Sequence, residues 1–176
     1  MIKKLFLLAV LAAFTFGAEA KVSLQKLLST PNNKSLLRQL GREEILSSKS
    51  EPGTQAIFFA SAKSKPELFY LLEFYKDEAA YKKHISSAHF KKFASASAEI
   101  LASKKAISLK KRAAFSKNLT PERLKDAYFH ITNLSLLAKI DAKFEKIIKK
   151  YMQKSVDDGA YAQFAFSQKD APNKWV

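Results

Sequence analysis

The residues most able to carry chemistry lie close together between Leu72 and Phe93. His84 and His89 have imidazoles, which change charge near neutral pH and could remove a proton from a bound molecule. The hydroxyl of Tyr75 could donate a hydrogen bond to the charge that then forms. The structural alternative is that both histidines only cap or pack a helix and that Tyr75 is a core aromatic. The sequence leaves both interpretations open.

Residue counts disfavour other kinds of active site. The chain has no cysteine and three histidines. His84 and His89 are five residues apart, so their side chains would not lie on the same face of a helix. We therefore expect no metal and no cofactor. The chain has only four glycines and no glycine-rich nucleotide-binding loop. The elbow motif of Ser-His-Asp catalysis is also not recognisable. His130 stands alone in a predicted strand, where a core or edge role is expected.

A helix and a hairpin precede these histidines. Apolar residues from Leu36 to Leu46 have helical spacing, and Glu51-Pro52-Gly53 ends that helix. Residues 54–62 and 67–75 are β-prone runs joined by a turn, which predicts a hairpin. Alternate positions of the second run are apolar on both faces, so we expect cover on both sides. Glu73 is the charge within that run and needs a partner if it is buried.

Two further helical stretches and a strand follow the hairpin. Asp77 and Glu78 are acidic residues at a helix start, where they complement the exposed N–H groups. Residues 79–104 are predicted to form two helical stretches that break near Ser86-Ser87. Residues 106–115 form a weaker strand. Its Lys110-Lys111-Arg112 run predicts an exposed sheet edge, where charge discourages unwanted pairing.

A second unit follows a polar linker at residues 116–126. Residues 128–137 and 160–167 are β-like, and residues 140–155 form an amphipathic helix. The passage from Glu51 to Tyr70 aligns without a gap with the passage from Asp157 to Val176, which predicts an internal repeat. The second copy is incomplete. Either the chain continues beyond Val176, or the last unit borrows strand partners from elsewhere.

The first twenty residues predict export. Lys3 and Lys4 precede an apolar stretch from Leu5 to Phe16, and an Ala-x-Ala site ends at Ala20. We therefore expect residues 1–20 to be a cleaved signal peptide and the protein to be periplasmic. The apolar stretch is shorter than the roughly 20 residues that span a bilayer, so no stable membrane insertion is expected.

The formal net charge of +15 raises two possible partners, nucleic acid and anionic lipid. The lysines are scattered along the chain, however, and Arg, which is preferred for specific phosphate recognition, is scarce. We expect no nucleic-acid partner and interpret the charge as keeping a small exported protein soluble. Association with anionic lipid is a weaker alternative.

The segment LEFYKDEAAYKKHISSAHFKKF resembles the signature region of the antibiotic biosynthesis monooxygenase family. The elements that match are Glu73, Tyr75, Asp77, Ala79, Ala80, Tyr81, His84, Ser87, His89 and Phe90, and the Glu51-Pro52-Gly53 turn matches as well. The resemblance implies an α+β fold: a ferredoxin-like β-α-β-β-α-β module of the dimeric α+β barrel type at residues 21–115. Residues 127–176 would be a partial second module. Family members pair as homodimers, and tandem copies could pair within one chain.

The same resemblance implies an activity. Similar enzymes oxidise quinols and other electron-rich aromatic molecules with molecular oxygen, often without metal or flavin. It implies catalytic roles for His84, His89 and Tyr75, and contacts of Glu73, Phe90 and Phe93 with a small aromatic or quinone-like substrate. Haem degradation is disfavoured because Ala94 and Tyr75 stand where haem-degrading relatives have His and Trp. The alternative is a non-catalytic ligand-binding or assembly module of the same fold, since fold does not fix function.

Overall fold

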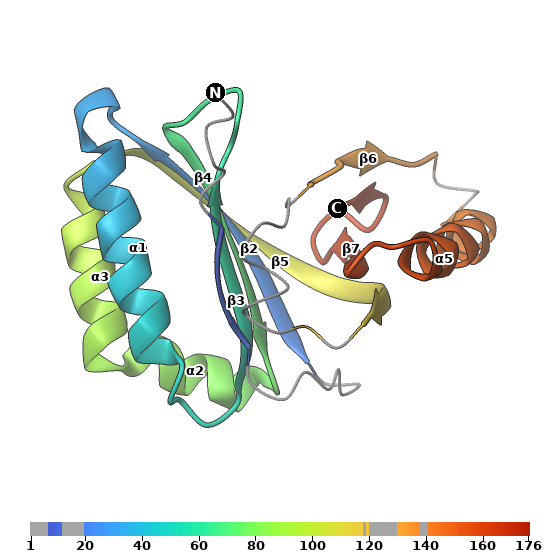
Figure 1. Ribbon diagram of the computed structural model, residues 1–176, viewed down its shortest axis with the longest axis horizontal. Helices are drawn as coiled ribbons and strands as arrows, with labels where there is room; N and C mark the ends of the chain where they lie inside the picture. Colours follow the sequence, from blue (N-terminus) through green and yellow to red (C-terminus); the bar gives the residue numbers. More distant parts are fainter. Residues whose placement is uncertain (1–6, 12–19, 118, 120–129, 138–140) are drawn as a thin grey trace.

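The chain folds into one antiparallel sheet with helices on both sides (Figure 1). The computed structural model describes residues 7–11, 20–117, 119, 130–137 and 141–176. The order of neighbouring strands is β1-β3-β4-β2-β5-β7-β8-β6. No helix in these described ranges is both long and apolar enough to cross a membrane.

The first module occupies residues 21–116 and has the expected β-α-β-β-α-β order. Its strands are β2 (Lys21–Ser29), β3 (Thr54–Ser61), β4 (Leu68–Tyr75) and β5 (Leu101–Ser116). Its helices are a short 3-10 turn η1 (Pro31–Asn33), α1 (Lys34–Ser48), α2 (Glu78–Ser86) and α3 (Ala88–Ala98). The spatial order β3-β4-β2-β5 is the ferredoxin-like arrangement, so the α+β prediction is confirmed.

The predicted hairpin and the helix break are both present. β3 pairs with β4 along its length, with Phe58 opposite Leu72. The side chain of Asp77 accepts a hydrogen bond from the Ala80 N–H at 2.7 Å and begins α2. Ser87 accepts one from the Phe90 N–H at 3.2 Å and begins α3. Because serine and aspartate satisfy the free N–H groups of a first turn, these two residues fix where each helix starts.

The second unit repeats part of this order. Its elements are β6 (Leu134–Ser135), α5 (Asp141–Asp157), β7 (Ala162–Gln168) and β8 (Lys174–Trp175). The neighbours β7-β8-β6 stand in the same relation as β3-β4-β2 in the first module. Gly53 and Gly159 both have positive φ, 94° and 131°, between helix and strand. The second unit is thus a partial copy of the fold, while the sequence repeat stays a prediction.

The expectation that β5 is an exposed edge was wrong. β5 pairs with β2 through its first half and with β7 through its second half, so it joins the two units. Arg112 does not repel a neighbour there, because its guanidinium lies over the ring of Trp175 at 5.3 Å and donates hydrogen bonds to Ser167 and Glu145. This part of β5 therefore pairs with β7, and Arg112 also contacts α5 through Glu145.

The remaining sequence predictions fall at the two ends of the described chain. β1 (Leu7–Leu11) lies within the expected signal peptide and pairs with β3 at the sheet edge. The strand predicted at 128–137 begins outside the described residues, and within 130–137 the strand is limited to β6. Figure 1 shows α1, α2 and α3 on one side of the sheet and the second unit on the other.

Candidate functional site

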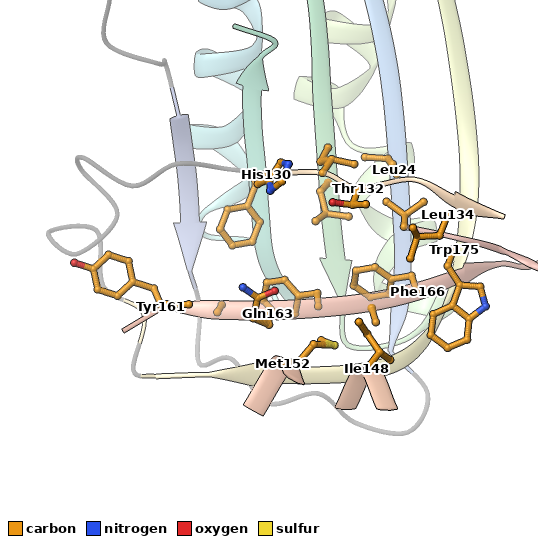
Figure 2. Close-up of a pocket in the computed structure, with 18 of the residues that line it drawn as sticks. Leu24, His130, Thr132, Leu134, Ile148, Met152, Tyr161, Gln163, Phe166 and Trp175 are labelled. Carbon is orange, nitrogen blue, oxygen red and sulfur yellow. The ribbon is translucent and has the colours of Figure 1, made fainter. Parts of the chain in front are cut away.

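A large pocket lies between the first module's sheet and the second unit. Its volume is about 570 Å³, within the ~300–1,000 Å³ range typical of small-molecule sites. The floor is the sheet face that carries Leu24, Phe58 and Leu72. Side chains of α5, β7 and β8 form the opposite walls, as Figure 2 shows for Ile148, Met152, Phe166 and Trp175.

Aromatic and aliphatic side chains line most of this pocket, and a few polar groups interrupt them. Phe74, on the same sheet face as Leu72, contacts Phe164 and Phe166 with ring centroids 5.3 and 5.9 Å apart. His130, Thr132 and Gln163 are polar lining residues (Figure 2). An apolar cavity with a small number of polar groups suits a flat, mostly apolar molecule that carries one or two oxygen atoms.

The residues predicted from the sequence lie on the other face of the sheet, under the helices. Glu73 on β4 is buried, with 3% of its surface exposed. The hydroxyl of Ser23 donates to one of its carboxylate oxygens at 2.6 Å, and that of Tyr75 donates to the other at 3.0 Å. The charge within the β4 run therefore has the partners that burial demands.

His84 and His89 share two further glutamates. His84 Nδ1 lies 2.8 Å from Glu51 Oε2, and His89 Nε2 lies 2.8 Å from Glu51 Oε1. On its other side, His89 Nδ1 is 3.0 Å from both oxygens of Glu44. Glu44 is on α1 and Glu51 is in the turn that follows. Three glutamates and two histidines thus form one connected network around the helix break.

The protein environment shifts the proton affinities in this network. Burial raises the pKa of Glu73, and the Ser23 hydrogen bond and the charge of His84 oppose that rise. For His89 burial acts to lower the pKa, but the hydrogen bonds and charges of Glu44 and Glu51 outweigh it and raise the pKa. Burial and the nearby Glu73 carboxylate raise the pKa of Tyr75, so its hydroxyl stays protonated.

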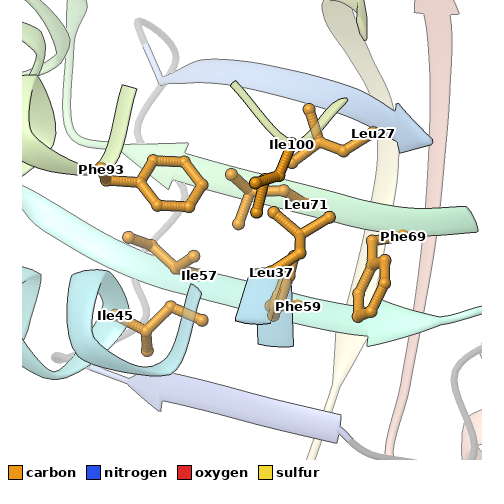
Figure 3. Close-up of a cluster of buried hydrophobic side chains, with 9 residues drawn as sticks. All are labelled: Leu27, Leu37, Ile45, Ile57, Phe59, Phe69, Leu71, Phe93 and Ile100. Atoms are coloured by element: carbon orange, nitrogen blue, oxygen red, sulfur yellow. The ribbon is translucent and has the colours of Figure 1, made fainter. Parts of the chain in front are cut away.

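Packed side chains fill the space between sheet and helices. Figure 3 shows this helix-side core, whose nine buried residues are Leu27, Leu37, Ile45, Ile57, Phe59, Phe69, Leu71, Phe93 and Ile100. α1 approaches β3 so closely at Gly41 that an added Cβ would meet the Phe59 ring at 2.3 Å. The cavity that remains beside Glu44, Glu73 and His84 is about 10 Å³. It has room for about one water molecule and not for an aromatic ring.

The structure brings most of the predicted residues together, but away from the large pocket. Tyr75, Glu73, His84 and His89 meet in the network, and the Phe90 ring contacts His84 at 5.0 Å. Phe93 belongs to the helix-side core. None of these six residues is among the described residues that line the 570 Å³ pocket. Their catalytic and substrate-binding roles stay predictions.

Sequence reasoning missed Glu44, Glu51 and the pocket residues. Glu44 and His89 are 45 residues apart in sequence, so local spacing gave no sign of their contact. A five-residue spacing keeps two histidines on different faces only where the helix is continuous. The break at Ser87 instead turns the start of α3 back, and the imidazole centroids of His84 and His89 lie 5.7 Å apart.

Known structures share this architecture. The antibiotic biosynthesis monooxygenase family model matches residues 30–96. A candidate antibiotic biosynthesis monooxygenase from Bacteroides thetaiotaomicron is 31% identical, with a TM-score of 0.52, covering 53% of this chain and 91% of that one. A candidate monooxygenase from Lactobacillus acidophilus is 20% identical, with a TM-score of 0.75, covering 89% of this chain and 74% of that one. No curated protein matches the chain.

These findings define the class first: an α+β protein with a monooxygenase-like ferredoxin-type module. The match at 31% identity covers nearly the whole of the Bacteroides structure, and the family model falls on the segment that contains the histidine network. The chain belongs to the antibiotic biosynthesis monooxygenase family. The Lactobacillus structure covers both units, so the partial second module is also an arrangement found in a known fold.

Proposed function

We propose that this chain is an exported protein that binds a small aromatic or quinol-like molecule in the pocket between its two units and oxidises it with molecular oxygen. The observation that carries the proposal is the pocket itself, about 570 Å³ in volume with mainly apolar and aromatic walls. Membership of a monooxygenase family supports the reaction class. A quinol would supply the electrons and protons itself: with one O₂ it would give a hydroxyquinone that carries one of the two oxygen atoms, and the other would leave as water.

Binding can be followed through the protein's own fluorescence. Trp175 is the one tryptophan of the sequence, is buried, and lines the pocket. Quinones quench tryptophan emission at short range, so titration with a soluble naphthoquinone should give saturable quenching. Quenching that rises linearly without saturation, as free tryptophan shows, would argue against a pocket ligand of this class.

Two neighbouring isoleucines of α5 provide a matched pair of variants. Ile148 lines the pocket, whereas Ile147 is 45% exposed and is not among the lining residues. Ile148→Ala should weaken naphthoquinone binding about fivefold to thirtyfold, because burying the lost carbons is worth ~1–2 kcal/mol. Ile147→Ala should leave affinity unchanged. Equal affinities of the two variants would place the ligand elsewhere.

Oxygen consumption tests the reaction separately. Reduced naphthoquinol should be consumed together with O₂, and ¹⁸O₂ should label the product with one oxygen atom. His130 has an imidazole at the pocket wall that could accept a phenolic proton, so His130→Ala should slow turnover while quenching by the quinone persists. The corresponding His84→Ala experiment tests the role that the family resemblance implies.

A non-catalytic binding module is the second candidate, and one observation favours it. The network that contains Tyr75, His84 and His89 is on the opposite face of the sheet from the pocket, under a filled core. Those side chains could not touch a molecule bound there. Saturable quenching without oxygen uptake by any quinol tested would support this second candidate.

Export and self-association complete the proposal. Cell fractionation should find a periplasmic form that begins after Ala20. We also propose that the second unit replaces a partner subunit, because β7 pairs with β5 inside one chain. Light scattering of the purified protein should then give the mass of one chain, and the mass of two chains would favour a homodimer.

A further inference from the structure

We propose that Glu44, His84 and His89, with Glu73 beside them, form a binding site for one divalent transition-metal ion such as Zn²⁺. This site lies under the helices and is independent of the pocket between the two units. Glu44, His84 and His89 each offer a donor atom within 4.8 Å of the others. They come from α1, α2 and α3, so the module's whole helix layer converges on the site.

The two contacts of His84 Nε2 with carboxylates are longer than hydrogen bonds and are closer to the donor spacing around a metal ion. His84 Nε2 is 3.6 Å from Glu44 Oε1 and 3.9 Å from Glu73 Oε1, beyond ordinary hydrogen-bond length. With zinc bonds of ~2.0–2.1 Å, donors of a tetrahedral site lie roughly 3.3 Å from each other. His89 Nδ1 is 3.0 Å from Glu44. Glu44, His84 and His89 would therefore supply three of the four ligands of a tetrahedral site and leave one position open.

A small cavity adjoins two of the proposed donors, Glu44 and His84, and His89 is not among its described lining residues. The space of about 10 Å³ is lined by Glu44, Glu73 and His84, and its other walls are apolar side chains such as Phe59 and Phe93. Such a space accepts about one small ion or water and excludes larger ligands. Glu44 and His84 are at least nine-tenths buried, with 6% and 2% exposed, so both donors are already withdrawn from solvent.

Hydrogen bonds behind the donors fix their orientation. Glu51 contacts the far nitrogen of each imidazole at 2.8 Å, which leaves His84 Nε2 and His89 Nδ1 facing Glu44. Metal-bound histidines commonly donate their other N–H to a carboxylate in this way. Nearby, the Ser23 hydroxyl donates to Glu73 Oε2 and the Tyr75 hydroxyl donates to Glu73 Oε1, the oxygen nearest His84. The orienting groups around the proposed donors are thus in place.

Charge and access also agree with a cation. Three carboxylates outnumber two imidazoles in this network, so added positive charge is favourable in a buried setting. Glu51 and His89 are partly exposed, with 14% and 25% of their side-chain surfaces accessible, and form an entry from the helix break. Mixed imidazole and carboxylate donors without thiolate suit Zn²⁺, Co²⁺ and related ions.

Titration with Co²⁺ tests the proposal, with any affinity tag removed. The full chain, first dialysed against a chelator, should bind one equivalent of Co²⁺ and develop visible d–d absorption that one equivalent of Zn²⁺ removes. His89→Gln should weaken binding at least tenfold. Glu51→Gln should weaken it about 10-fold to 100-fold, as expected for an orienting carboxylate. Circular dichroism before titration checks that each variant is folded.

His130→Gln is the matched control, because His130 is the third histidine of the sequence and lies at the other pocket. It should bind Co²⁺ as the unchanged chain does. The proposal fails if the folded chain binds no stoichiometric Co²⁺ or Zn²⁺, which would leave a network of hydrogen-bonded imidazoles and carboxylates only. It also fails if His89→Gln and Glu44→Gln bind Co²⁺ as tightly as the unchanged chain.

Discussion

The two sides of the central sheet differ in how completely their apolar side chains are covered. On the helix side, packing leaves a space of about 10 Å³ around the glutamate and histidine network. On the other side, the second unit leaves a pocket of about 570 Å³, and Tyr151 of α5 is 65% exposed. The complete module thus supplies a rigid, filled core, and the partial copy supplies room for a ligand.

The largest expected change in stability comes from replacing one phenylalanine with alanine on each side of the sheet. Phe59 is fully buried and stacks on Phe69, whereas Phe144 is only half-buried against Trp175. Phe59→Ala should lower the free energy of unfolding by about 3–5 kcal/mol, since it leaves a cavity in a packed core. Phe144→Ala should cost about half as much. Urea denaturation measures both, and equal losses would contradict the difference in packing.

The paired glycines give a smaller effect. Gly53→Ala and Gly159→Ala both place a side chain at positive φ, but the added Cβ would lie 2.6 Å from the Ala80 Cβ only in the first case. We expect Gly53→Ala to cost about 2–4 kcal/mol, because backbone strain and a clash add. Gly159→Ala should cost about 1–2 kcal/mol from strain alone. If thermal or urea unfolding ranked them the other way, the two turns would not differ as described.

The smallest expected effect concerns the charged contact that joins the two units. Lys149 donates a 2.6 Å hydrogen bond to Glu145, and that bond, with the charges of Lys149 and Arg112, lowers the pKa of Glu145. A carboxyl group whose pKa is lowered by folding stabilises the protein above its unfolded pKa and loses that contribution as the pH falls through the folded value. Glu145→Gln should therefore cost about 0.5–1 kcal/mol at pH 7 and little at pH 3.

An exposed pair on the same helix serves as its control. Lys154 and Asp158 also form a contact four residues apart, but their side chains are 68% and 60% exposed. Asp158→Asn should change the unfolding free energy little at either pH, because water screens such pairs. A pH-dependent loss of similar size in both variants would mean that joining the two units adds nothing to the Glu145 contact.

Much of the first module could be predicted because its signals are local. Pro52 and Gly53 end a helix, alternating apolar residues define β4, and Asp77 and Ser87 begin helices, so each element is encoded within a few residues. The family resemblance then supplied the order of the strands. The strand Lys21–Ser29 had no such local signal, because its buried positions do not follow a simple alternation.

The site was less predictable because it depends on distant contacts. Glu44 lies in a helical pattern where a charge ordinarily faces solvent, yet the packing of α1 against α3 buries it beside His89. Lys110-Lys111-Arg112 looked like an edge because no local feature indicates that Trp175 lies beneath Arg112. Predicting the pocket would have required knowing how the two units pack together, and no short sequence pattern encodes that.

β1, which pairs with β3, lies in the segment that the sequence predicts to be a cleaved signal peptide. Residues Leu7–Leu11 lie opposite Ala56–Ala60 and occupy one border of the sheet. If peptidase cleavage after Ala20 removes this stretch, the amide and carbonyl groups on that side of β3 lose their neighbour in the precursor. An unpaired edge strand readily forms hydrogen bonds with a strand of another chain. Precursor and processed forms would then differ in their tendency to associate.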